Sequence, residues 1–285
     1  MDTNPGPVLR RRQAGTRLRQ LREAAGRSLS DVAAYLDCSP AKISRIETGR
    51  LLARVPDVRN MLDLYGIPED QRGELLDLIR ESREKGWWHE YADILSDGLG
   101  TLIGFEDAAA DISVYDSYLV PGLLQTREYF YMMSGRRTDI TDEQVERYLA
   151  LRLRRQEILR RPSPPRMHFV IDESALHRVC ELGSATAREQ LSHLSDVAHQ
   201  PQVTVQVLTY GAGLGASSGL SFQMFGFADP GDPKVVFADQ ILGPTFDTKF
   251  DVVARYAAAF DGVRADALNP AESIAFVADL LGRLP

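Results

Sequence analysis

The stretch Ser28–Arg50, SLSDVAAYLDCSPAKISRIETGR, decides the fold of the N-terminal part of the chain. Ser28 begins an S-x-x-D capping box, in which a serine hydroxyl accepts a hydrogen bond from an unpaired N–H group at a helix start. Ser39 and Pro40 begin a second helix, because serine caps helices and proline is tolerated at the first helical position. Gly49 is a suitable residue to end it. The pattern predicts two short helices joined by a tight turn.

Each of these two helices has one apolar face. The apolar residues recur at helical spacing and are expected to be buried: Val32, Ala33, Leu36, Ile43 and Ile46. The other faces of the second helix carry small and basic side chains, which suit a helix that enters a DNA groove: Ala41, Lys42, Ser44 and Arg45.

These residues resemble the helix-turn-helix of the phage-repressor-like, xenobiotic-response-element (XRE) family of DNA-binding regulators. The match runs from about Leu18 to Leu64, and its core, AKISRIETGR, follows the recognition-helix pattern of that family. The resemblance implies a sequence-specific transcriptional regulator, such as a repressor, that binds double-stranded DNA. Regulators of this type read DNA as homodimers, so we expect a homodimer. An ordinary three-helix interaction module is the alternative.

The resemblance also implies roles for individual residues. We expect Ala41 to contact a thymine methyl group and Arg45 to contact guanine O6 and N7. Arg22 matches a buried arginine that pairs with a glutamate of the recognition helix, here Glu47, so the two are expected to form a structural ion pair. The complete expected DNA-binding set, in which Ser28, Lys42 and Arg50 hold phosphates, is Ser28, Leu29, Ser39, Pro40, Ala41, Lys42, Ser44, Arg45 and Arg50.

Charge is distributed unevenly along the chain. The net charge is −7, yet residues 1–60 hold 12 Arg and Lys against 6 Asp and Glu, which leaves −13 for the other 225 residues. This asymmetry predicts a basic nucleic-acid module joined to an acidic body. We expect neither a membrane span, which needs ~18–20 apolar residues, nor a secretory signal. The two cysteines, Cys38 and Cys180, predict a reducing, cytoplasmic location rather than a disulfide framework.

Periodicity and turn residues divide the chain into three parts. Residues 1–11 are expected to be a disordered arm, 12–85 an all-α helix-turn-helix domain of five helices, and 86–285 an α+β domain for sensing or partner binding. The last part is expected to contain a mixed sheet of about four strands, with alternating or apolar runs at 167–171, 203–208, 220–227 and 235–238.

Four strings in the larger part resemble the C-terminal domain of a group of actinomycete helix-turn-helix regulators: GWWHEYADIL, YDSYLVPGLLQTREY, VTVQVL and FDVVARYAAAFDGVRADALNPAES. The activity of that domain is uncharacterised. The resemblance implies a small protein partner or, second, a small-molecule effector. We expect partner contacts in the segment around the Pro121-Gly122 turn, with a buried corner as the alternative; the candidate residues are Tyr118, Leu123, Leu124 and Gln125.

Catalytic and metal motifs are weak in this sequence. The formal G-x-S-x-G match at 215–219 precedes a strand rather than the helix that a nucleophile elbow requires. The glycines of 211–219 lack the spacing of a dinucleotide-binding motif. We expect a plain surface loop there, with a mobile loop over a pocket as the alternative. Asp172 and Glu173 are paired acids or, as we prefer, helix-capping residues. We therefore expect no enzyme activity, no cofactor and no metal. A DNA-tethered antitoxin-like or enzymatic module is the competing hypothesis.

Overall fold

The computed structural model describes residues 6–135, 139–212, 221–240 and 243–285. Contacts between residues divide the chain into two units. The first comprises Met1–Glu90 with Gly100–Ala108, and the second Tyr91–Leu99 with Ala109–Pro285. We expected the boundary after residue 85; this division also includes residues 86–90 and 100–108 in the first unit. The helix α6, Asp97–Ala108, contributes residues to both units.

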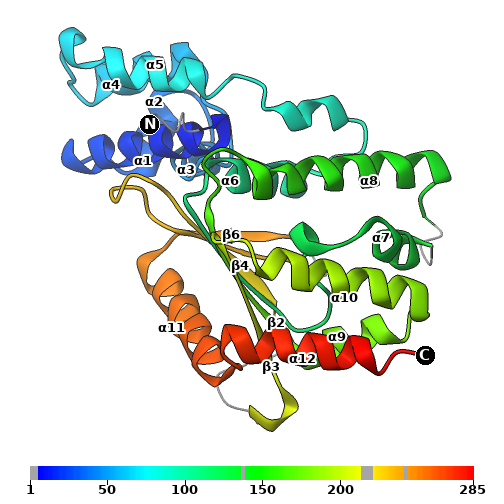
Figure 1. Ribbon diagram of the computed structural model, residues 1–285. Helices are drawn as coiled ribbons and strands as arrows, with labels where there is room; N and C mark the ends of the chain where they lie inside the picture. Colours follow the sequence, from blue (N-terminus) through cyan, green and yellow to red (C-terminus); the bar gives the residue numbers. More distant parts are fainter. Residues whose placement is uncertain (1–5, 136–138, 213–220, 241–242) are drawn as a thin grey trace. The chain divides into compact units, whose positions relative to one another are not determined.

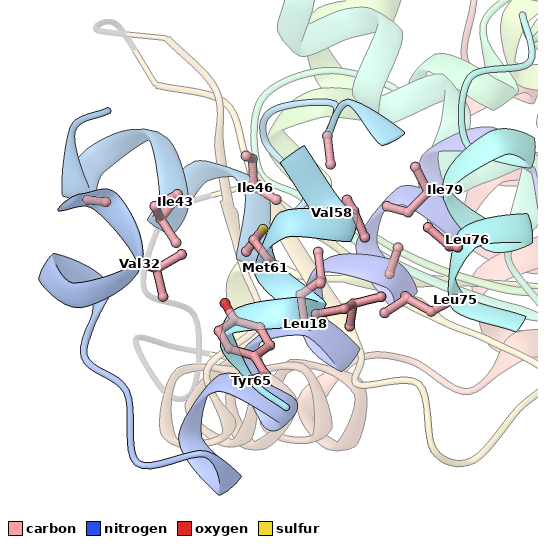
Figure 2. Close-up of a cluster of buried hydrophobic side chains, with 14 residues drawn as sticks. Leu18, Val32, Ile43, Ile46, Val58, Met61, Tyr65, Leu75, Leu76 and Ile79 are labelled. Atoms are coloured by element: carbon pink, nitrogen blue, oxygen red, sulfur yellow. The ribbon is translucent and has the colours of Figure 1, made fainter. Parts of the chain in front are cut away.

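Five α-helices of the first unit, as expected from the sequence, surround one core. They are α1 (Pro7–Ala24), α2 (Leu29–Tyr35), α3 (Pro40–Glu47), α4 (Val55–Leu64) and α5 (Gly73–Glu81), with short 3₁₀ turns at Glu69–Gln71 and Trp87–Tyr91. Figure 2 shows the side chains that these helices bury together, including Leu18 of α1, Val32 of α2, Ile43 of α3, Met61 of α4 and Leu76 of α5. All five helices therefore depend on a shared apolar centre.

The prediction of a disordered arm over residues 1–11 is wrong for its second half. Helix α1 begins at Pro7, and Arg10 is buried with its guanidinium 3.3 Å from Glu81 and 3.2 Å from Glu84. The guanidinium of Arg12 lies 5.9 Å from the centre of the Phe105 ring. These arginines join α1 to other helices of the first unit, which periodicity could not reveal. Residues 1–5 lie outside the described part.

Left-handed residues follow the first four helices and set the turns between them. Gly26, Gly49 and Gly66 have φ values of 65°, 69° and 72°, as is typical of residues that end helices. The turn between α2 and α3 uses Asp37 instead, with φ 49°. The N–H of Cys38 donates to the carbonyl of Ala33 at 2.9 Å, which completes a Schellman motif. Aspartate is one of the few side chains that tolerate this conformation.

Helix α1 lies very close to the end of α3 at Gly15. A Cβ atom at Gly15 would lie 2.5 Å from the carbonyl oxygen of Ile46 and 2.7 Å from that of Glu47. Both are backbone atoms, so a side chain at this position would displace one helix from the other. Gly15 therefore fixes the separation of α1 and α3, a constraint that the sequence analysis missed.

One six-stranded mixed sheet forms the centre of the second unit, in the order β3-β2-β1-β4-β5-β6. Its strands are β1 (Asp111–Asp116), β2 (Arg166–Asp172), β3 (Val203–Leu208), β4 (Phe222–Gly226), β5 (Val235–Ala238) and β6 (Thr245–Asp247). Strands β1, β2 and β3 pair in parallel, while β4, β5 and β6 continue the sheet from β1 in antiparallel pairs. The α+β class is therefore confirmed.

The expected number of about four strands is too low, because β1 and β6 were missed. Strand β1 has aspartate at both ends, which is disfavoured in strands, and it owes its place to pairing on both sides, with β2 and β4. Strand β6 has only three residues, too few to show a periodicity. Pairing partners distant in sequence therefore decided β1, whereas β6 pairs only with β5, the strand before it, and is too short to be predicted.

Helices cover both faces of this sheet (Figure 1). The chain between β1 and β2 forms α7 (Arg127–Ser134) and α8 (Asp142–Gln156), and between β2 and β3 it forms α9 (Glu173–Cys180) and α10 (Ser184–Ala198). Helix α11 (Phe250–Asp266) packs Phe260 and Val263 onto the face that holds Tyr115 and Phe222. Helix α12 (Pro270–Gly282) contacts α10 and β3. Within the described residues, no helix has the length and apolar character needed to cross a membrane.

Replacing Gly15 with alanine is expected to destabilise the chain by about 1–3 kcal/mol, because overpacking of a close backbone contact forces the helices apart. The matched control is Gly73→Ala. A Cβ atom at Gly73, at the start of α5, would meet nothing within 4 Å. This control should be neutral or stabilising by roughly 0.4–1 kcal/mol. Urea unfolding of the two variants measures the difference, and equal effects would contradict the role of Gly15.

Candidate nucleic-acid interface

Two serines cap the N-termini of α2 and α3. The hydroxyl of Ser28 accepts from the N–H of Asp31 at 3.1 Å, while the N–H of Ser28 donates to the Asp31 carboxylate at 2.7 Å. The N–H of Ser28 and, next in effect, its hydroxyl, which donates to the same carboxylate at 2.8 Å, hold the pKa of Asp31 below its usual value. The hydroxyl of Ser39 accepts from the N–H of Lys42 at 3.2 Å. Both serines thus cap the helices that the sequence predicted.

Arg22 and Glu47, expected as a structural ion pair, lie in direct contact. The Arg22 guanidinium donates two hydrogen bonds to the Glu47 carboxylate, at 2.7 Å and 2.9 Å, and a third to the carbonyl of Arg27 at 2.8 Å. The first of these contacts holds the pKa of Arg22 above its usual value. The Glu47 side chain is only 3% exposed, so α3 is anchored to α1 through a buried pair.

One face of α3 stays open to solvent. Ala41, Arg45 and Thr48 are exposed, while Ser44 is half-buried. The Arg45 guanidinium has no hydrogen bond or ion pair with any described residue. The face therefore offers one small apolar side chain, Ala41, and one exposed cation, Arg45, the two residues that we expect to contact bases.

Besides the capping serines, Lys42 and Leu29 of the expected DNA-binding set also have partners within the first unit. The Lys42 ammonium lies 3.0 Å from the carboxylate of Asp57 in α4, so it is already neutralised within the first unit. The side chain of Leu29 packs against the helical core. Both contacts join residues from different helices, so spacing along one helix gave no sign of them. Arg50, after α3, and Pro40, at its start, are exposed.

Tyr35 is a surface residue that the sequence analysis missed. It is the last residue of α2 and is 55% exposed, directly before the turn that leads into α3. The buried positions of this segment are Val32 and Ala33, and Leu36 packs partly against the core. Tyr35 falls outside that spacing, which was the available sign that its ring faces solvent. An aromatic ring here extends the exposed surface beside α3.

The expected partner-binding segment is instead a buried corner, with one exception. Leu123, Leu124 and Gln125 are 3%, 0% and 3% exposed. The Gln125 amide donates to the carbonyl of Val120 at 2.7 Å, and the fully buried Gln190 of α10 donates to the carbonyl of Leu124 at 2.8 Å. These hydrogen bonds satisfy the backbone of a turn that would otherwise need water, which explains why the segment can be apolar and buried.

Tyr118 is the exception, and it belongs to a second polar surface. It is 58% exposed, and the guanidinium of Arg178 in α9 lies 4.3 Å from the centre of its ring. Tyr210, after β3, is 61% exposed and stacks on His177 of α9, with 5.9 Å between ring centres. Two exposed tyrosines therefore flank α9.

This second surface lies where the parallel strands end. Asp116 ends β1, and its carboxylate accepts from the N–H groups of Tyr118 and Leu119 and from the hydroxyl of Ser221 at 3.2 Å, 3.1 Å and 2.9 Å. Burial nevertheless raises the pKa of Asp116, against the effect of those hydrogen bonds. Strands β2 and β3 extend the sheet on one side of β1, and β4, β5 and β6 extend it on the other, so the strand order changes direction at β1. Ligands of open α/β sheets bind at such switch points.

Candidate catalytic groups have structural contacts. The carboxylate of Asp172 accepts from the N–H of Ser174 at 2.9 Å and caps α9. Glu173 accepts from the N–H of Tyr210 at 2.8 Å and contacts His177 at 3.0 Å. Among the described residues no group of three or more His, Cys, Asp or Glu could hold a metal ion. The glycine-rich match at 215–219 and most of the loop 211–219 lie outside the described part.

Two segments of the chain match known protein families. Residues 99–279 match a family described as a domain of unknown function (DUF5753), and residues 13–75 match a helix-turn-helix domain. Comparisons with curated proteins and with solved structures found no match. The helix-turn-helix match includes the capped helices α2 and α3 and the exposed residues of α3.

Replacing Glu47 with alanine is expected to cost about 3–5 kcal/mol of folding stability, because it leaves the guanidinium of Arg22 buried without its partner. The matched control is Asp77→Ala in α5. Asp77 pairs with Arg80 in the same helix, but both side chains are more than half exposed, at 63% and 52%. An exposed pair of this kind contributes only about 0.2–1 kcal/mol. Chemical denaturation of both variants tests the pair; similar losses would show that the Arg22–Glu47 contact is not a buried anchor.

Proposed function

The chain belongs to the DUF5753 family, and from the helix-turn-helix in its N-terminal part we propose that it is a sequence-specific transcriptional regulator of the XRE type. The observation that carries the proposal is the open face of α3. Its inward residues are fully used in the core and the Arg22–Glu47 pair, while Ala41 and Arg45 remain exposed. In this proposal the protein acts in the cytoplasm by binding DNA, as a repressor, and carries out no catalytic step.

A homodimer is the proposed DNA-binding form. One recognition helix reaches only a few base pairs, and helix-turn-helix regulators gain specificity by placing two copies on half-sites about 34 Å apart, or multiples of that spacing. A two-fold symmetric protein then matches a palindromic operator.

The second unit is proposed to bind a small protein partner or, second, a small-molecule effector. The surface that supports this is the end of the parallel strands, where Tyr118 and Tyr210 are exposed beside α9. Tyrosine is enriched at protein interfaces because its ring buries a large area while its hydroxyl keeps a polar partner. An effector would use the buried Asp116 at the same switch point.

Arg45→Ala is expected to cost about 1–3 kcal/mol of operator binding and to relax the preference at one base pair in each half-site. Selection of binding sites from random duplex DNA, with the wild-type chain and the variant, measures this. The wild-type chain should select two half-sites in the spacing of a dimer. An unchanged preference in the variant would refute the reading role of Arg45, a single unpaired half-site would refute the dimer, and no enrichment with the wild-type chain would refute the function.

Tyr118→Ala and Tyr210→Ala are expected to keep the melting temperature of the full chain and to reduce the amount of partner that co-purifies with it from its native cells. Leu124→Asp provides the contrast, because this fully buried leucine should lower the melting temperature. Retention of the partner by both tyrosine variants would place the binding surface elsewhere on the second unit.

A further inference from the structure

We propose that Asp57 is a positioning residue for DNA binding, which withholds Lys42 of the recognition helix from the phosphate backbone. The inference rests on the proposed function and adds to it a residue of α4, outside the two capped helices α2 and α3. Its basis is the contact between the Lys42 ammonium and the Asp57 carboxylate at 3.0 Å, which joins α3 to the first turn of α4.

Lys42 is the cation of this helix best suited to phosphate. It is the only lysine in residues 1–84, where the other basic residues are arginines. A lysine ammonium binds phosphate as a compact point charge, whereas the planar fork of an arginine such as Arg45 matches the two acceptors of guanine. Without Asp57, α3 would therefore present one base-reading cation and one that binds any sequence.

Asp57 is well placed to hold this lysine. It lies in the first turn of α4, where a negative charge interacts favourably with the helix dipole. The two side chains are 34% and 23% exposed, so water screens the pair only in part. If Lys42 moved to a phosphate, the charge of Asp57 would be left unpaired next to a polyanion. The pair therefore disfavours a phosphate contact in two ways. Asp57 holds the Lys42 ammonium, and its negative charge repels the DNA backbone.

The expected consequence is a recognition surface with weak affinity for DNA in general. Each phosphate contact adds a slope of about −0.9 to the dependence of log K on log salt, whatever the sequence. By keeping Lys42 from such a contact, Asp57 lowers this sequence-independent contribution and leaves discrimination to the base contacts of α3.

The test compares binding of the full chain and of its Asp57→Asn variant to a random-sequence duplex and to the duplex selected by the wild-type chain, across a salt series. Asp57→Asn is expected to steepen the salt slope on both duplexes by about 0.9. It should also tighten binding to the random duplex roughly two- to fivefold at low salt, the range by which a partly exposed pair shifts an equilibrium. Thermal melting of each variant confirms that it is folded.

Two controls separate release of Lys42 from a change in net charge. Asp63→Asn removes the same charge from the same helix, but its carboxylate pairs with Arg72 at 2.6 Å, so the salt slope should stay close to wild type. Lys42→Ala should likewise leave the slope nearly unchanged, and in that background Asp57→Asn should add nothing to it. This double-mutant cycle isolates the pair.

The outcomes distinguish the inference from the function on which it depends. If the wild-type chain binds DNA and Lys42→Ala alone flattens the salt slope by about 0.9, Lys42 already contacts phosphate and the inference is overturned. An unchanged slope in Asp57→Asn, or an equal change in Asp63→Asn, would also overturn it while leaving the proposed function intact. If the wild-type chain binds neither duplex, both fall.

Discussion

The position of α3 on the core depends on one buried ion pair, between Arg22 of α1 and Glu47 of α3. Two hydrogen bonds join the charged groups, and a third connects Arg22 to the backbone of Arg27, so the guanidinium is largely satisfied away from water. A buried pair adds little net stability compared with apolar side chains, but it penalises any arrangement that separates the two charges. The close backbone contact at Gly15 joins the same two helices, so the ion pair and this contact together hold α3 against α1.

A helix fixed in this way can present only its remaining face to DNA. The inward residues are committed, so recognition falls to Ala41 and Arg45 in our proposal, and the charge of Lys42 is balanced by Asp57. The basic character of residues 1–60 is then partly misleading, because Arg10, Arg12 and Arg22 are buried in contacts within the first unit. A basic composition is thus a weaker sign of DNA contact than the exposure of particular cations.

A small group of polar residues of the second unit, including Asp116, Tyr118 and Tyr210, lies where three parallel strands end. Parallel strands bring their carboxyl ends to one edge, so residues distant in sequence, such as Asp116 and Tyr210, share it. The apolar corner at Leu123 and Leu124 follows β1 directly but turns inward, because buried glutamines satisfy its backbone. Exposed tyrosines rather than apolar leucines therefore form the surface that we propose for a partner.

The sequence by itself determined what depends on residues a few positions apart. The caps at Ser28 and Ser39, and the helices that they begin, follow from hydrogen bonds between residues three positions apart. Resemblance to a family supplied the pairing of Arg22 with Glu47. Only the tertiary structure decided the contacts of Gly15, Lys42 and β1, and the burial of the corner after β1. For each of these features, the contacting residues lie on another helix or strand. The spacing of residues along one helix or strand does not show such a contact.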